Sequence, residues 1–259
     1  MSTPKKKVSR ILKNFHATGT KGLAWLVDPD NFINSALFEE EFAWVKDSYL
    51  DLIFVGGSTL SRDNFREVVT SVKKIAGKIP VVIFPGSQMQ LAEEADAILF
   101  LSLISGRNPE YLIGQQVLAA PIIKKMRLEA LPTAYMLVND GDITSVQYVT
   151  QTVPLPNSKP DLAKATALAG SYLGMKYFFM DAGSGAKNPV CGEVIKAVKM
   201  ATNKPILVGG GLDSLQKVKT AYESGADLLV IGNAIEKDSS FLAKVLDYKV
   251  LLNLSLNVN

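Results

Sequence analysis

The sequence contains one cysteine, one histidine and no long hydrophobic segment. The single cysteine, Cys191, cannot form an internal disulfide, and with only His16 available no Cys/His zinc site can be built. This sparing use of cysteine fits a reducing, cytoplasmic compartment. The longest apolar runs have the length of strands, so we expect no membrane span, and residues 1–15 lack the apolar stretch of a signal peptide.

An excess of charge of one sign is also lacking. The chain has 28 lysines and arginines against 25 aspartates and glutamates, and part of the net charge of +3 comes from Lys5, Lys6 and Lys7. This balance is too weak for the basic surface that binds nucleic acid, so we expect no nucleic-acid partner. We predict that residues 1–15 form a flexible or peripheral N-terminal segment.

Short apolar runs recur along the 259 residues, each followed by polar or glycine residues and by a stretch with helical spacing. The runs are apolar throughout, as in a parallel sheet that helices cover. Their alternation with helices favours an α/β fold closed into a TIM (β/α)8 barrel, with one domain over residues 1–259. The strands are expected at 23–27, 52–55, 81–84, 97–101, 133–138, 177–180, 206–208 and 228–231.

Helices are expected at 64–76, 112–125, 161–173, 191–201, 215–224 and 241–246. We predict Ser61 and Asp213 as helix N-caps, and Gly77 and Gly225 as C-caps. Residues 139–160 break the rhythm, because they are polar and contain three prolines. They predict a long loop at the catalytic face, which is either a lid or wall of a substrate channel or a plain surface excursion.

Glycine-rich segments follow the last three expected strands: DAGSG at 181–185, GGGLD at 209–213 and GN at 232–233. Glycine lets backbone N–H groups approach an anion closely, and barrels commonly bind phosphate after strands seven and eight. The three segments together predict a phosphate site. The alternative is that these glycines only form tight turns.

Side chains with oxygen atoms follow the first two strands, at Asp28 and Ser58. Both should face one cavity, and a carboxylate with a hydroxyl suits Mg2+, which keeps several waters and binds substrate phosphates. The alternative is that both residues cap the segments that follow them. Asp181, after the sixth strand, is a candidate to hold or deprotonate a hydroxyl, or to cap its glycine turn.

Other reactive or bulky side chains are interpreted as structural. His16 precedes the first strand and is expected at the surface or in packing. Cys191 begins a helix with no partner base and is expected to fill buried space. The core is expected to contain Trp25, Trp44, Tyr177, Phe178 and Phe179.

Eight segments spread over nearly the whole chain form a specific set when taken in order. They are LVDPD at 26–30, FVGGS at 54–58, FPGS at 84–87, SGRNPEYLIGQQV at 105–117, KPDLAKATALAG at 159–170, DAGSGA at 181–186, VGGGL at 208–212 and IGNAIEKD at 231–238. With them the chain resembles the geranylgeranylglyceryl phosphate synthase family, especially the branch with bacterial members, which is related to heptaprenylglyceryl phosphate synthase.

The resemblance implies a TIM-barrel prenyltransferase of ether-lipid synthesis. It would join the C3 hydroxyl of sn-glycerol 1-phosphate to a geranylgeranyl-type polyprenyl diphosphate and release pyrophosphate. Asp28 and Ser58 look like the family's Mg2+ ligands, and Asp181 would orient or deprotonate the hydroxyl. The substrate-binding residues implied are Phe179, Met180, Asp181, Ala182, Gly183, Ser184, Gly185, Gly210, Gly211, Gly232 and Asn233.

The sequence departs from the family at two positions of this site. The family more often has a glutamate with an aromatic residue two positions before it, whereas this chain has Phe179 and Asp181. The acid is therefore one methylene shorter, and the aromatic ring lacks a hydroxyl.

Two other functions fit parts of the pattern. An isomerase or epimerase acting on a sugar phosphate would share the phosphate site but would need an acid/base pair near the first strands. A non-catalytic binder of prenyl lipid or phosphate is the other alternative, supported by the shortened acid at 181. The apolar helix expected at 112–125 indicates a homo-oligomer, and peripheral contact with a membrane surface is compatible with a lipid substrate.

Overall fold

The chain folds into a closed barrel of eight parallel strands, seen in a computed structural model that describes residues 7–32 and 34–256. Neighbouring strands pair in sequence order, and the last strand pairs with the first, which confirms the predicted TIM barrel. The strands are β1 (Gly22–Val27), β2 (Leu52–Val55), β3 (Val81–Ile83), β4 (Ala97–Leu103), β5 (Glu129–Leu137), β6 (Tyr177–Asp181), β7 (Ile206–Gly209) and β8 (Leu228–Ile231).

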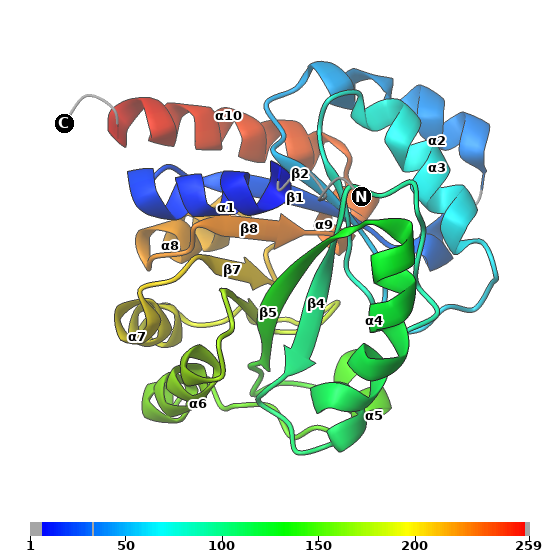
Figure 1. Cartoon of the computed structure of the whole chain (residues 1–259). Coiled ribbons are helices and arrows are strands. Elements are labelled where there is room, and N and C mark those ends of the chain that lie inside the picture. The colour runs from blue at the N-terminus through cyan, green and yellow to red at the C-terminus, as the bar shows by residue number, and fades with distance from the viewer. Residues whose placement is uncertain (1–6, 33, 257–259) are drawn as a thin grey trace.

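Helices lie outside the strands (Figure 1). They are α1 (Lys7–Thr18), α2 (Ser35–Glu41), α3 (Phe65–Ala76), α4 (Gln115–Met126), α5 (Ser145–Thr150), α6 (Pro160–Tyr172), α7 (Gly192–Thr202), α8 (Leu215–Glu223), α9 (Asn233–Lys237) and α10 (Ser240–Leu256). Tighter 3-10 turns occur at Pro29–Asn31 and Ala43–Asp47, and a π-helical turn at Glu110–Gly114 precedes α4. Within the described residues, no helix is both long and apolar enough to cross a membrane.

The apolar strands are buried on both faces, which explains why their sequences do not alternate. In β2, Leu52 and Phe54 point into the barrel, whereas Ile53 and Val55 pack against the outer helices. All four side chains are fully buried. Each strand therefore contributes to two cores, one inside the barrel and one between the barrel and the helices.

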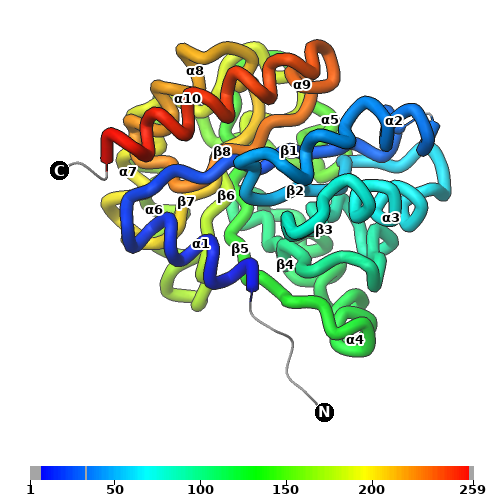
Figure 2. Tube along the Cα trace, turned by 90° about the horizontal axis from the view of Figure 1, so that it is seen from above, coloured from blue at the N-terminus to red at the C-terminus, as the bar shows by residue number. Residues whose placement is uncertain are grey.

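Helix α1 covers the N-terminal end of the barrel. A flexible or peripheral segment was expected for residues 1–15, of which residues 1–6 lie outside the described part of the chain. Its apolar side chains, among them Leu12 and Phe15, belong to the core inside the barrel. The carboxylate of Glu129, at the start of β5, accepts hydrogen bonds of 2.9 Å from the backbone N–H groups of Val8 and Ser9. These bonds satisfy free donors of the first turn of α1, which lies beside β5 and β6 (Figure 2).

Two predicted N-caps are wrong. Ser61 donates two hydrogen bonds to Asp30 instead, and α3 follows Asn64. Asp213 forms an ion pair with Lys217, while the hydroxyl of Ser214 caps α8. Ser61 thus bonds to a residue of another loop, whereas Asp213 pairs with a lysine of the helix that it precedes.

Gly77 is confirmed as the C-cap of α3, with a φ of 57°, whereas Gly225, with a φ of 111°, lies one residue beyond Ser224, the C-cap of α8. Helix α10 continues to Leu256, well beyond the expected end at residue 246. Lys249 is buried within this helix, and its ammonium group is paired with Asp51 at 2.6 Å. Trp25 is buried as expected, but Trp44 is 39% exposed, so its assignment to the core was wrong.

Candidate active site

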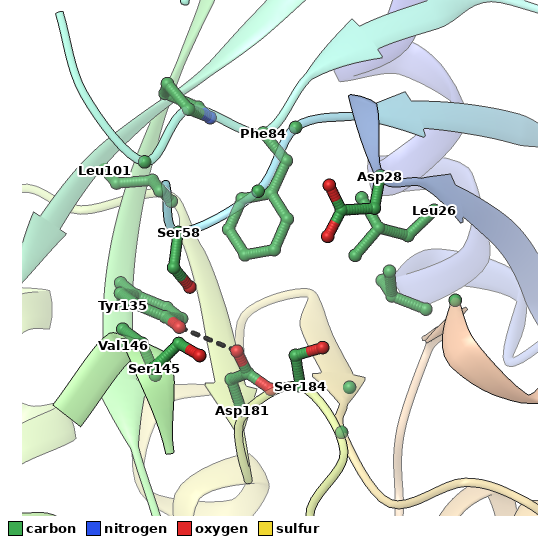
Figure 3. Close-up of a pocket in the computed structure, with 18 of the residues that line it drawn as sticks. Leu26, Asp28, Ser58, Phe84, Leu101, Tyr135, Ser145, Val146, Asp181 and Ser184 are labelled. Atoms are coloured by element: carbon green, nitrogen blue, oxygen red, sulfur yellow. Dashed lines mark hydrogen bonds between the residues drawn. The ribbon is translucent and has the colours of Figure 1, made fainter. Parts of the chain in front are cut away.

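A cavity of about 430 Å3 opens at the C-terminal ends of the strands (Figure 3). Its polar end brings together residues far apart in the sequence, because parallel strands present their C-terminal loops at one face of a barrel. The predicted site residues that line it are Asp28, Ser58, Phe179, Asp181, Ser184, Gly185, Gly210, Gly211, Gly232 and Asn233. Met180 and Ala182 do not line it, because their side chains alternate outward into the core beneath the helices.

Asp28 extends from the end of β1 into the cavity. Its Oδ1 accepts a 3.0 Å hydrogen bond from the backbone N–H of Asp30, so it also caps the following 3-10 turn, as the alternative interpretation proposed. Burial raises the pKa of the Asp28 carboxyl. Glu236 on α9 accepts a hydrogen bond from the Asp28 backbone N–H, and burial likewise raises the pKa of Glu236.

Ser58 lies on the loop after β2, and that loop is held by a buried amide that the sequence analysis missed. The side chain of Gln90 donates to the carbonyl of Gly57 at 2.8 Å and accepts from the N–H of Gly86 at 3.1 Å. It thereby ties the loops after β2 and β3 together. In Figure 3, Asp28 and Ser58 lie on the two sides of the Phe84 ring, with both polar groups in the cavity.

Asp181 is 7% exposed and ends β6 at the centre of the polar region. Its Oδ2 accepts a 2.6 Å hydrogen bond from the hydroxyl of Tyr135, and its Oδ1 accepts a 2.8 Å bond from the backbone N–H of Gly183. Burial raises the pKa of Asp181, and these two hydrogen bonds oppose the rise. Tyr135 was missed by the sequence analysis, because a tyrosine inside the apolar fifth strand looks like a core residue.

The loops after β6, β7 and β8 meet at the other side of Asp181. Gly210 has a φ of 80°, and a β-carbon there would lie 2.7 Å from Asp181 Oδ1, so only glycine fits. The hydroxyl of Ser184 donates a 2.9 Å hydrogen bond to the side-chain oxygen of Asn233. This bond joins the loops after β6 and β8, and the glycines between them leave backbone N–H groups near the cavity.

An apolar arm extends the cavity from Phe84 towards the space between β4 and α4. It is lined mainly by Ile98, Phe100, Leu101, Leu103, Ala119, Ile123, Val146 and Val149. The segment 139–160 supplies part of this wall, since it contains α5 and is not purely loop. The segment therefore lines the cavity and is not a plain surface excursion.

Negative charge exceeds positive charge around the cavity. Of the described residues, the aspartates at 28, 30, 181 and 213 line it, against the lysines at 187 and 237. Lys187 is already paired with Asp142, and Asp213 with Lys217, each at 2.8 Å, so the excess of negative charge remains when both pairs are left out. No cluster of three Asp, Glu, His or Cys side chains suitable for a metal occurs in the part of the chain that the structure describes.

His16 and Cys191 lie apart from this cavity. His16 is on α1 at the opposite end of the barrel, with Nδ1 2.8 Å from Nζ of Lys199. Cys191 is half-buried, not fully buried as expected, and its Sγ donates to the carbonyl of Asn157. Burial raises the pKa of its thiol, which disfavours the nucleophilic thiolate.

Comparisons with known proteins agree with this arrangement. A geranylgeranylglyceryl phosphate synthase of Spirosoma linguale is 45% identical over 235 residues, which cover 91% of this chain and 94% of that protein. One of Chitinophaga pinensis is 46% identical over 231 residues, which cover 89% and 91%. The crystal structure of (S)-3-O-geranylgeranylglyceryl phosphate synthase from Thermoplasma acidophilum, in complex with its substrate sn-glycerol-1-phosphate, has a TM-score of 0.80 and 31% identity, covering 92% of this chain and 93% of that one.

The characteristic sequence pattern of the PcrB family matches residues 20–249, which include every strand of the barrel and all the predicted site residues. With relatives this similar over nearly their full length, the chain belongs to the PcrB family.

Proposed function

We propose that this chain joins the C3 hydroxyl of sn-glycerol 1-phosphate to a polyprenyl diphosphate of the geranylgeranyl type, forming an ether-linked prenylglyceryl phosphate and pyrophosphate. The observation that carries the proposal is the shape of the cavity, in which an apolar arm opens into a glycine-rich polar end. A long prenyl chain and a small phosphorylated alcohol match these two parts. The named activity of the relatives and the substrate in the Thermoplasma structure support the same reaction.

In this proposal, sn-glycerol 1-phosphate occupies the polar end. The backbone around Gly185, Gly210 and Gly211 and the loop of Gly232 and Asn233 bind its phosphate, because closely approaching N–H groups favour an anion. The segment from Phe179 to Gly185 lies along the glycerol. Asp181 is then the carboxylate that receives the C3 hydroxyl.

Mg2+ is the cofactor we propose, bound by Asp28 and Ser58. Both present hard oxygen atoms to the cavity, and few protein ligands are typical of Mg2+ sites, which take water and substrate phosphate as the remaining ligands. The surplus of aspartates over lysines supports this proposal, because two anionic substrates in the same space would add negative charge that a cation offsets. When bound, Mg2+ supplies charge neutralisation for the departing diphosphate.

Each part of the site then has its own role in the reaction. The apolar arm fixes the prenyl chain with its first carbon towards the polar end. Asp181 accepts the proton of the C3 hydroxyl as the alcohol oxygen forms the new C–O bond, while the allylic C–O bond to the diphosphate breaks. The walls from α4 and α5 keep water away from the reacting carbon, so that the alcohol and not water captures it.

We further propose that the protein forms a homo-oligomer through α4. The turn before this helix and the helix itself expose four large apolar side chains: Ile113, Val117, Leu118 and Ile122, which are 43–62% exposed. A surface of this kind commonly contacts another protein. Light scattering of the purified protein, compared with a variant carrying Val117→Lys and Leu118→Lys, tests the assembly.

The test of the function is a direct assay with sn-glycerol 1-phosphate, a series of polyprenyl diphosphates and Mg2+, with extraction of the lipid phosphate for mass spectrometry. We expect a prenylglyceryl phosphate that is lost in EDTA and in Asp28→Ala. Retention of product in EDTA would contradict the proposed Mg2+ site but not the transferase activity. No product with any diphosphate, despite binding of glycerol phosphate, would contradict the transferase and favour a non-catalytic binder.

A further inference from the structure

The acid of the proposed active site lacks a hydroxyl partner on its own strand. Two residues before Asp181, on the same face of β6, the aromatic ring is that of Phe179, which cannot form a hydrogen bond. The hydroxyl comes from the neighbouring strand instead. Tyr135 on β5 is the register partner of Phe179, its ring lies 5.7 Å from the Phe179 ring, and its long side chain reaches the carboxylate of Asp181 (Figure 3).

We propose that Tyr135 is a positioning residue for the prenyl transfer, holding the carboxylate of Asp181 in the orientation that receives the proton of the attacking hydroxyl. This inference rests on the proposed role of Asp181. Tyr135 acts through the acid, and its ring also lines the cavity.

The carboxylate of Asp181 is free to rotate unless other groups restrain it. Rotation of an aspartate carboxylate about its last bond is broad, so an acid at a reacting centre needs external restraints. Asp181 has one on each oxygen, Gly183 N–H at 2.8 Å on Oδ1 and Tyr135 O–H at 2.6 Å on Oδ2. Each carboxylate oxygen can accept a second bond, so the restrained group still has a lone pair for the substrate.

The direction of the hydrogen bond is fixed by chemistry. Burial and the nearby charge of Asp181 raise the pKa of Tyr135 well above its ordinary value, so the phenol keeps its proton and donates it. The rings of Phe84 and Phe179 pack against the Tyr135 ring at 5.9 and 5.7 Å, which limits its movement. The Tyr135 hydroxyl is therefore restrained, as the Asp181 carboxylate is.

In the described part of the chain, Tyr135 is the side chain that donates to this carboxylate. The strand on the other side of β6 presents Gly209 and Gly210 at this level. The titratable side chains that line the same cavity are Asp28, Asp30, Tyr111, Lys187, Asp213 and Lys237, and within the described residues none of them hydrogen-bonds to Asp181. Loss of the Tyr135 hydroxyl thus leaves Oδ2 without a protein partner.

The experiment compares Tyr135→Phe with Tyr177→Phe. Both tyrosines are buried in the core inside the barrel, but the Tyr177 hydroxyl bonds to Ser9 at the opposite end. Assays use sn-glycerol 1-phosphate, geranylgeranyl diphosphate and Mg2+ across pH. For Tyr135→Phe we expect kcat to fall by about 10–100-fold with little change in KM for the diphosphate. The acidic limb of the profile should move to higher pH, because the lost hydrogen bond had lowered the pKa of Asp181.

Tyr177→Phe should lose stability without changing kcat or the acidic limb. If Tyr135→Phe behaves in the same way, Tyr135 only packs the core and the proposal is overturned. The variant Asp181→Asn tests the proposed role of Asp181 separately from the role of Tyr135. An inactive Asp181→Asn with an unaffected Tyr135→Phe removes this inference alone, whereas an active Asp181→Asn, or an inactive wild type, removes the proposed role of Asp181 and this inference with it.

Discussion

Gly57 lies directly against the carboxylate of Asp28. A β-carbon at position 57 would be 2.9 Å from Oδ1 of Asp28, and the same loop presents Ser58, the other proposed Mg2+ ligand. The absence of a side chain at 57 is what allows the loop after β2 to approach the acid at the end of β1. Because the loop after β2 approaches so closely, the Asp28 carboxylate and the Ser58 hydroxyl face the same cavity.

Gly57→Ala is therefore expected to displace the Asp28 carboxylate and raise the Mg2+ concentration needed for half-maximal activity by about 10-fold or more. Titration of the initial rate with Mg2+ measures the effect. Gly174→Ala is the control, since Gly174 has a φ of 89° but no atoms near the added carbon, and it lies in the turn after α6. That variant should lose stability and keep the Mg2+ dependence of the wild type. An unchanged requirement in Gly57→Ala would place the metal elsewhere.

On acidification, we expect activity to be lost at a higher pH than the ordinary pKa of an aspartate would give. Burial raises the pKa of both Asp28 and Asp181 above the ordinary value of 3.8. Metal binding and proton acceptance both need the ionised form, so activity is lost as pH falls through these raised values. The measurement is kcat/KM against pH at limiting Mg2+ and constant ionic strength, because saturating Mg2+ would keep Asp28 ionised, with circular dichroism to verify folding. A flat profile down to about pH 4 in folded protein would contradict the assignment of these acids.

The fold was predictable because its signals are local and repeated. Continuous apolar strands, helices between them and glycines after the last strands each point to a parallel barrel, and small errors in strand ends do not change this pattern. Individual contacts were less predictable. Ser61 has the residue type of an N-cap, yet it bonds to Asp30 on a distant loop, which sequence spacing does not show.

The site was predictable where residue type and strand end coincide, as at Asp28 and Asp181. It was not predictable where a partner comes from another strand or a neighbouring loop. Tyr135 looks like an ordinary core residue of β5, and only the register that places it beside Phe179 brings its hydroxyl to the acid. Gln90 is similar, because its role arises only when the loops after β2 and β3 close around it.

Helix α1 should contribute to stability and not to catalysis. Leu12 is 1% exposed in the core inside the barrel, at the end opposite the cavity. We expect Leu12→Ala to lower the free energy of unfolding by about 2–5 kcal/mol, measured by urea denaturation, while kcat at low temperature is retained. Leu254→Ala removes the same atoms from a leucine that is 58% exposed on α10, and should change stability by less than about 0.5 kcal/mol. Equal effects would show that α1 is not part of the core.

The apolar arm should set the length of prenyl chain that the protein accepts. Ala119 on α4 is 7% exposed and lines the arm, so a phenyl ring there occupies space that a long chain needs. Ala119→Phe is expected to lower kcat/KM for geranylgeranyl and heptaprenyl diphosphate by about 10-fold or more and to spare farnesyl diphosphate. Ala120→Phe adds the same ring to the neighbouring, exposed position and should leave the preference unchanged. If Ala119→Phe keeps the wild-type ratio between the three diphosphates, the prenyl chain does not lie between β4 and α4, and the division of the cavity into an apolar and a polar part loses its functional meaning.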